Sequence, residues 1–95
     1  MVRSEARIAT DSADRFAKQL CNHANRMGAS STWTPPEGVI DFPQGGTCHL
    51  RAGGDELVLI AEAVAAADLA TIQAIVAADL QRFGQRDGMT VTWSA

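Results

Sequence analysis

The chain has few of the residues that carry catalytic chemistry or positive charge. Its 95 residues include one Lys, two Cys and two His. A net charge of −3, with seven Arg scattered among acidic residues, argues against nucleic-acid binding, which requires a basic face. The two Cys lack the Cys-x₂₋₄-Cys spacing that structural zinc sites use. The sequence also contains no nucleophile elbow and no glycine-rich loop between a strand and a helix N-terminus.

Long apolar runs are absent as well. The longest, residues 57–67, is interrupted by Glu62 and is too short to cross a bilayer. The first residues contain no apolar segment typical of a signal peptide. We therefore expect a cytoplasmic protein with no membrane contact and with free thiols, although a disulfide between Cys21 and Cys48 stays open as an alternative.

The overall composition is that of one globular domain covering residues 1–95. Hydrophobic residues make up 46% of the chain and charged residues 20%, values that are ordinary for a folded protein. A chain of this length forms one core. We find no internal repeat, low-complexity tract or linker, so a division into two domains is not expected.

Hydrophobic periodicity predicts two helices. Apolar residues recur at helical spacing over residues 13–27 and 68–83, and a glycine follows each segment as a natural stop. Thr10 or Asp11 is expected to cap the first helix, because short polar side chains satisfy the free N–H groups of the first turn.

Short segments with alternating or β-rich residues predict the strands. They cover residues 5–9, 39–42, 47–52, 57–63 and 89–93, with an additional strand at 30–34 around Trp33. Short glycine-containing loops imply antiparallel hairpins. The segment 57–63 is apolar on both sides, so we expect it in the interior of the sheet.

These elements predict an α+β fold in two layers. The order is β-α-β-β-β-α-β, with the additional strand near Trp33. An antiparallel sheet of five or six strands would have both helices on one face, since each helix has one apolar stripe to bury.

The chain resembles a family of small bacterial proteins known as domain of unknown function 2218. The resemblance rests on the segments ARIAT (6–10), KQLCNH (18–23), GTC (46–48) and LQRF (80–83) followed by Arg86. It covers nearly the whole chain, and the order of these motifs carries it.

The resemblance implies an accessory role in iron handling. Domains of this family also occur joined to flavin-dependent siderophore-interacting reductases, so a flavin reductase is an expected protein partner. The chain departs from the family pattern at one position. Members often carry Cys-x-His-x-x-His on the first helix, and Arg26 stands here in place of the second His. A metal site that used both His would therefore lack one ligand.

The four Cys and His side chains form two close pairs in the sequence. On a helix, Cys21 and His23 point about 160° apart, and on a strand Cys48 and His49 point to opposite faces. Only Cys21 and Cys48 are therefore expected to meet, beneath the helices. We favour the interpretation that both are small buried hydrophobic residues. The alternative is a metal-binding or thiol-redox site formed by Cys21 and Cys48, with His23 nearby.

Two surfaces are candidates for partner contact. Arg82 and Arg86 close the second helix. The positive charge of Arg82 is favourable at the negative end of the helix, which is a structural explanation. The functional alternative is that Arg82 and Arg86 contact an anion or a partner. The outer face of the sheet is expected to mix polar and apolar side chains, as dimer and partner surfaces often do. Its predicted members are Thr47, His49, Arg51, Val58 and Ile60.

The absence of an assembled catalytic set favours a non-enzymatic binding or accessory domain. It would dock a protein partner, a second copy of itself or a small ligand, without a resident cofactor. The alternative function is the metal-binding or thiol-redox module described above, with a metal ion as its cofactor.

Overall fold

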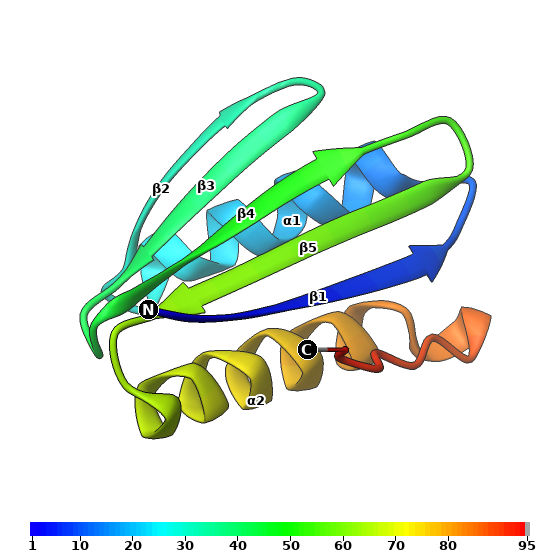
Figure 1. The fold of residues 1–95 in the computed structure, drawn as a ribbon. Helices are drawn as coiled ribbons and strands as arrows, with labels where there is room; N and C mark the ends of the chain where they lie inside the picture. Colours follow the sequence, from blue (N-terminus) through cyan, green and yellow to red (C-terminus); the bar gives the residue numbers. More distant parts are fainter. Residues whose placement is uncertain (95) are drawn as a thin grey trace.

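One antiparallel sheet of five strands forms the centre of the protein in the computed structural model, which describes residues 1–94 (Figure 1). The strands are β1 (Val2–Ala9), β2 (Ser30–Thr34), β3 (Glu37–Phe42), β4 (Gly46–Ala52) and β5 (Glu56–Ala63). Their order across the sheet is β1-β5-β4-β3-β2. The strand predicted to be interior is β5, which pairs with β1 on one side and β4 on the other.

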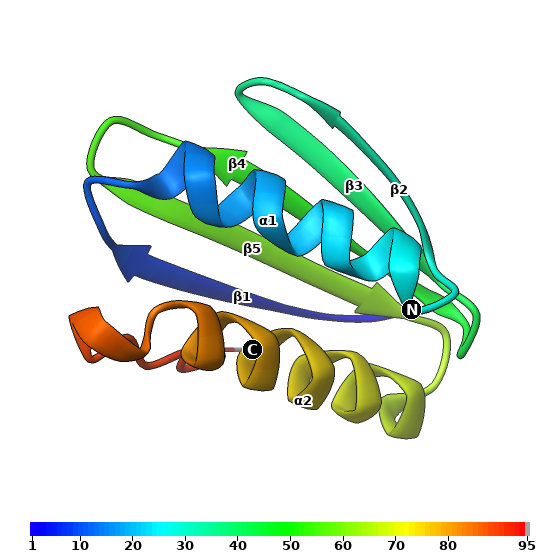
Figure 2. The same ribbon diagram turned by 180° about the vertical axis from the view of Figure 1, so that it is seen from behind.

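Two helices lie on the same face of this sheet (Figure 1, Figure 2). They are α1 (Ala13–Arg26) and α2 (Ala66–Phe83), and a short 3-10 helix, η1 (Gln85–Asp87), follows α2. Both helices contact β4, β5 and each other. This arrangement confirms the predicted two-layer α+β fold.

The core lies between the helices and the sheet. Along β5 the burial alternates strictly, so one side of the strand faces the helices and the other faces outward. The largest fully buried side chains are Phe16, Leu20, Ile40, Leu50, Leu57, Leu59, Ile72 and Leu80. Each contributes about 1.5–3 kcal/mol when it leaves water, so this layer supplies most of the favourable free energy of folding.

The N-cap of helix α1 lies one residue after Asp11 and two after Thr10, the two predicted caps. This N-cap is Ser12, whose N–H donates to the Thr10 hydroxyl at 3.1 Å, so the Thr10 side chain still supports the first turn. The helix ends at Arg26, and Gly28 follows with φ +93°. Because this left-handed conformation favours glycine, Gly28 ends the helix as predicted.

Helix α2 has 18 residues and begins at Ala66, two positions before the predicted start. Its stripe of Ile72, Val76 and Leu80 is buried against the sheet, as the periodicity predicts. Within residues 1–94, neither helix combines the length and the apolar character that a membrane crossing requires.

The additional strand near Trp33 is confirmed as β2. It pairs with β3 and forms one edge of the sheet. Helix α1 covers part of this edge, because the Ser31 N–H donates to Asn25 Oδ1 at 2.8 Å and the Ser31 hydroxyl donates to the Cys21 carbonyl at 2.7 Å. These bonds satisfy an edge N–H that would otherwise be open to another strand.

The predicted strand at residues 89–93 is wrong. The segment alternates as expected, with Met89, Val91 and Trp93 partly buried against the core, but it is not a strand. Its backbone bonds elsewhere: the Val91 N–H donates to Gln81 Oε1 on α2 at 3.2 Å. The backbone pairs with the sheet just after this segment, at Ser94, which forms an isolated bridge with Glu5.

Candidate functional site

The two cysteines lie in the core, as predicted. Cys21 is 1% exposed and Cys48 is 0% exposed, and both thiols are free. Cys21 lies against β3, where a Cβ added to Gly38 would come within 3.1 Å of its Sγ. Cys48 on β4 lies opposite Ile40, which is two residues after Gly38 on β3. The two thiols therefore share the helix-facing side of the sheet.

Burial makes both thiols poor nucleophiles. It raises the pKa of the Cys48 thiol to about 12, with a further contribution from the Cys21 thiol. Burial also raises the pKa of Cys21, although a hydrogen bond with Ser31 opposes the shift. Since the thiolate is the reactive form, both cysteines are expected to be inert at neutral pH.

His23 lies at the contact between the two helices, where its neighbours come from α2. Its Nε2 is 3.6 Å from Asp79 Oδ1 and 3.3 Å from Arg82 Nη2. Its ring meets the Phe83 ring edge to face, with 5.6 Å between ring centroids. The imidazole therefore contacts a carboxylate, a guanidinium and an aromatic ring of the neighbouring helix.

The structure does not bring Cys21, His23 and Cys48 together as a ligand set. Among the side chains that the structure describes, no three of Cys, His, Asp or Glu gather closely enough to hold a metal ion. The physical reason is the helical geometry, because residues two positions apart on α1 point to different sides.

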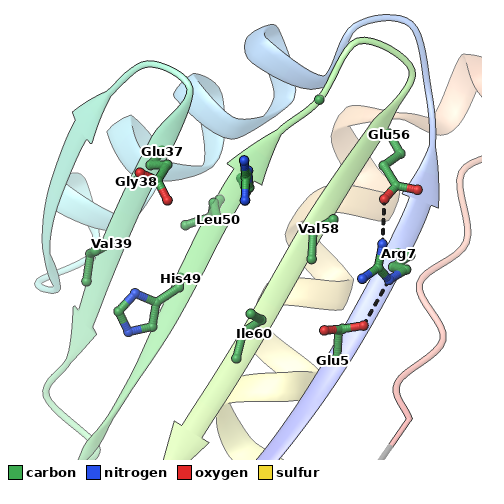
Figure 3. A pocket seen from close by; sticks show the side chains of 12 residues that line it. Glu5, Arg7, Glu37, Gly38, Val39, His49, Leu50, Glu56, Val58 and Ile60 are labelled. Carbon is green, nitrogen blue, oxygen red and sulfur yellow. Dashed lines mark hydrogen bonds and ion pairs between the residues drawn. The ribbon is translucent and has the colours of Figure 1, made fainter.

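The outer face of the sheet is hollowed, and neither helix covers it (Figure 3). The hollow has a volume of about 570 Å³. Strand pairing brings Val39, His49, Ile60 and Glu5 into one row across β3, β4, β5 and β1. The parallel row is Glu37, Arg51, Val58 and Arg7. Val58 and Ile60 of β5 therefore form an apolar pair between His49 and Arg51 of β4 and the charged Glu5 and Arg7 of β1, which border the hollow.

Arg7 forms the centre of an ion-pair cluster on this border. Its Nε donates to Glu5 Oε2 at 2.9 Å and its Nη1 donates to Glu56 Oε1 at 2.8 Å (Figure 3). The hydrogen bond and charge of Glu5, followed by the charge of Glu56, raise the pKa of the Arg7 guanidinium. Because the cluster is exposed, its ion pairs contribute little to the free energy of unfolding. Their effect is to hold the three side chains in a fixed orientation.

The predicted outer face is correct but incomplete. His49 faces outward, 3.9 Å from Glu62, and Val58 and Ile60 are only partly covered. The sequence pattern did not identify Glu5, Arg7 and Glu56 as members of this face. The signal available was the alternation of Glu5 and Arg7 with buried residues along β1, but their neighbours become known only through the pairing of β1 with β5.

A second, smaller cleft lies between α1, α2 and β3. His23 and Asp79 line it together with apolar side chains that include Leu20, Ile40 and Val76. Its volume of about 190 Å³ is below the roughly 300–1,000 Å³ that is usual for ligand pockets. The outer face of the sheet is therefore the stronger candidate site.

Arg82 and Arg86, predicted together at the end of α2, lie in different environments. Arg82 donates to Asp79 Oδ1 at 3.3 Å, and its guanidinium carbon lies 5.2 Å from the centre of the Phe83 ring. Arg86 is exposed in η1. Arg82 is thus partly engaged within the protein, and contact of either Arg with an anion or partner stays a prediction.

Comparison with known proteins identifies the family. Residues 5–94 match the family model described as "Uncharacterized protein conserved in bacteria (DUF2218)". The chain belongs to this family. A solved structure has a similar fold: the NMR structure of PA4090 from Pseudomonas aeruginosa aligns with a TM-score of 0.81 and 32% sequence identity, over 99% of this chain and 96% of that one. None of the curated proteins compared with the chain matches it significantly.

Proposed function

We propose that this DUF2218 domain is a non-enzymatic, cytoplasmic binding module that docks onto a protein partner through the outer face of its sheet. The observation that carries the proposal is the uncovered hollow of about 570 Å³, in which the apolar pair Val58 and Ile60 lies between polar and charged residues of β4 and β1. An apolar centre with a polar rim is the usual anatomy of a protein interface.

The lining of the hollow favours docking over catalysis. Among the described residues that line it, none carries a hydroxyl or thiol nucleophile. His49 is its only imidazole, and the nearest carboxylate partner of that ring, on Glu62, is 3.9 Å away. A nucleophile activated by a neighbouring base is thus missing from this surface.

The charges of the hollow specify what the partner presents. Arg7 already engages Glu5 and Glu56, whereas no ion pair between described residues involves Glu37 or Arg51. The partner is therefore expected to offer an apolar side chain at the centre, a basic group facing Glu37 and an acidic group facing Arg51.

A flavin-dependent siderophore-interacting reductase is the partner that we propose. What supports it is the occurrence of such domains joined to these reductases, which links the module to iron metabolism. A second copy of this chain is the competing occupant of the face, because oligomers of identical chains are common.

The experiment measures binding of the purified domain to the reductase of the same organism by isothermal titration calorimetry. Val58→Glu puts a charge into the apolar pair, and Val64→Glu is the matched control, because Val64 is 79% exposed outside the hollow. We expect Val58→Glu to weaken binding at least about tenfold, equivalent to about 1.4 kcal/mol, and Val64→Glu to leave it unchanged. Circular dichroism checks that both variants fold.

Three outcomes contradict the proposal. Absence of binding by the unaltered domain removes the reductase as partner, and equal binding by both variants removes the outer face as the docking surface. A stable dimer in light scattering that Val58→Glu dissociates assigns the face to a second copy.

The metal-binding or thiol-redox alternative stays a prediction, which native mass spectrometry checks through bound metal or a reversible disulfide between Cys21 and Cys48.

A further inference from the structure

The solvent-facing side of α1 carries a basic groove on a protein that is acidic as a whole. Arg15, Lys18 and Arg26 line the groove together with His23, and Phe83 of α2 contributes an aromatic ring. Its volume is about 290 Å³, and no Asp or Glu is among the described residues that line it. The groove therefore concentrates positive charge, although the formal net charge of the chain is −3.

The cations of this groove are free to meet an external anion. No ion pair between described residues involves Arg15, Lys18 or Arg26, whereas Arg7 has two carboxylate partners and Arg82 has one. Arg15 lies over the Phe16 ring, 4.8 Å from its centre, which fixes its stem without neutralising its charge.

Helical geometry arranges these cations in a line. At about 100° per residue, Arg15, Lys18 and Arg26 fall within about 80° of one another around the helix axis, and Arg15 and Arg26 are about 16 Å apart along it. A single phosphate or carboxylate cannot contact both ends of such a line. An extended peptide rises about 3.3 Å per residue, so roughly five residues span it.

The side of the groove formed by α2 adds an apolar surface. The half-buried Phe83 ring packs edge to face against His23, with 5.6 Å between centroids. An apolar side chain placed between acidic residues would thus find a surface to contact while its neighbours meet Lys18 and Arg26.

We propose that this groove binds an extended acidic peptide segment of a protein partner, with an apolar residue against Phe83. Three aligned cations on a chain of net charge −3 fit a short acidic segment better than a nucleic acid, whose binding requires a broad basic face. The groove lies on the opposite side of the molecule from the sheet's outer face, so this proposal is independent of the docking function above.

Fluorescence anisotropy with a labelled acidic octapeptide, six Glu or Asp around two central Leu, tests the proposal at 50 mM and 300 mM salt. We expect binding that weakens at the higher salt, because ions screen exposed charges. Lys18→Gln and Arg26→Gln should each weaken it about threefold or more, and the double variant about tenfold or more. Arg3→Gln, on β1, is the matched control, and we expect less than a twofold change from it.

Four results would overturn the assignment. They are no binding at 50 mM salt, an equal loss in Arg3→Gln, complete displacement of the peptide by millimolar inorganic phosphate, and tighter binding of a single-stranded DNA octamer. The second would show a net-charge effect, the third a single-ion site and the fourth a nucleic-acid surface. None of these results depends on whether the reductase binds the sheet.

Discussion

His23 Nε2 on α1 lies 3.6 Å from Asp79 Oδ1 on α2, so a polar contact joins the two helices at the edge of the core. Arg82 donates to the same carboxylate oxygen at 3.3 Å. Both partners are largely shielded, with side-chain exposures of 24% for His23 and 16% for Asp79. The contact is therefore worth more than an ion pair on an open surface.

Asp79→Asn is expected to lower the free energy of unfolding by about 1 kcal/mol, because it removes the charge that His23 and Arg82 share while keeping the size of the side chain. Urea unfolding followed by circular dichroism measures the loss. Asp55→Asn is the control, since Asp55 is exposed in a turn. Equal effects of the two substitutions would show that the helix contact contributes nothing.

Gly46 marks a second close approach, between the start of β4 and its neighbours. A Cβ at this position would lie 2.6 Å from the backbone oxygen of Glu62 and would collide with the end of the Ile72 side chain. We expect Gly46→Ala to lower the free energy of unfolding by roughly 1–3 kcal/mol, as overpacking in a well-packed region does. Thermal and urea unfolding measure this cost.

Gly54→Ala provides the comparison for Gly46→Ala. An added Cβ at Gly54 meets no atom within 4 Å, and its φ is not positive. We expect a change within about 0.5 kcal/mol there. If Gly46→Ala proves equally mild, β4 and β5 must separate more easily than their pairing indicates.

The sequence predicted the helices and most strands because their buried residues follow a clear period. The error at residues 89–93 has a physical cause. Alternation reports which side chains point inward, and Met89, Val91 and Trp93 do so. It does not report whether the backbone finds a pairing edge, and here a Gln81 side chain takes the Val91 N–H.

The candidate site was predictable only in part, for a related reason. Strand periodicity separates His49, Val58 and Ile60 from the core and predicts one outer face. It cannot show that Glu5 and Arg7 border this face, because that depends on the pairing of β1 with β5, strands far apart in sequence. The basic groove likewise requires Phe83 to lie beside α1, a contact that tertiary packing alone creates.

The buried thiol of Cys48 predicts a loss of stability in alkaline solution. Its pKa in the folded protein is about 12, raised from an ordinary value of 9.0 by burial. The unfolded chain therefore releases this proton at lower pH than the folded protein does. The contribution of the protonated Cys48 thiol to the free energy of unfolding is fully present below about pH 9. It declines by about 1.4 kcal/mol per pH unit above that pH and is lost once the pH exceeds the pKa of the folded protein.

Urea unfolding of the native protein and of Cys48→Ala between pH 8 and pH 11 measures this contribution. The variant lacks the thiol, so its free energy of unfolding should fall less steeply with pH, while all other titrating groups are common to both proteins. The difference between the two slopes should approach about 1.4 kcal/mol per pH unit above pH 9. Parallel slopes would mean that Cys48 titrates alike in the folded and unfolded chains, as an accessible thiol would, and would reopen its assignment as a buried hydrophobic residue.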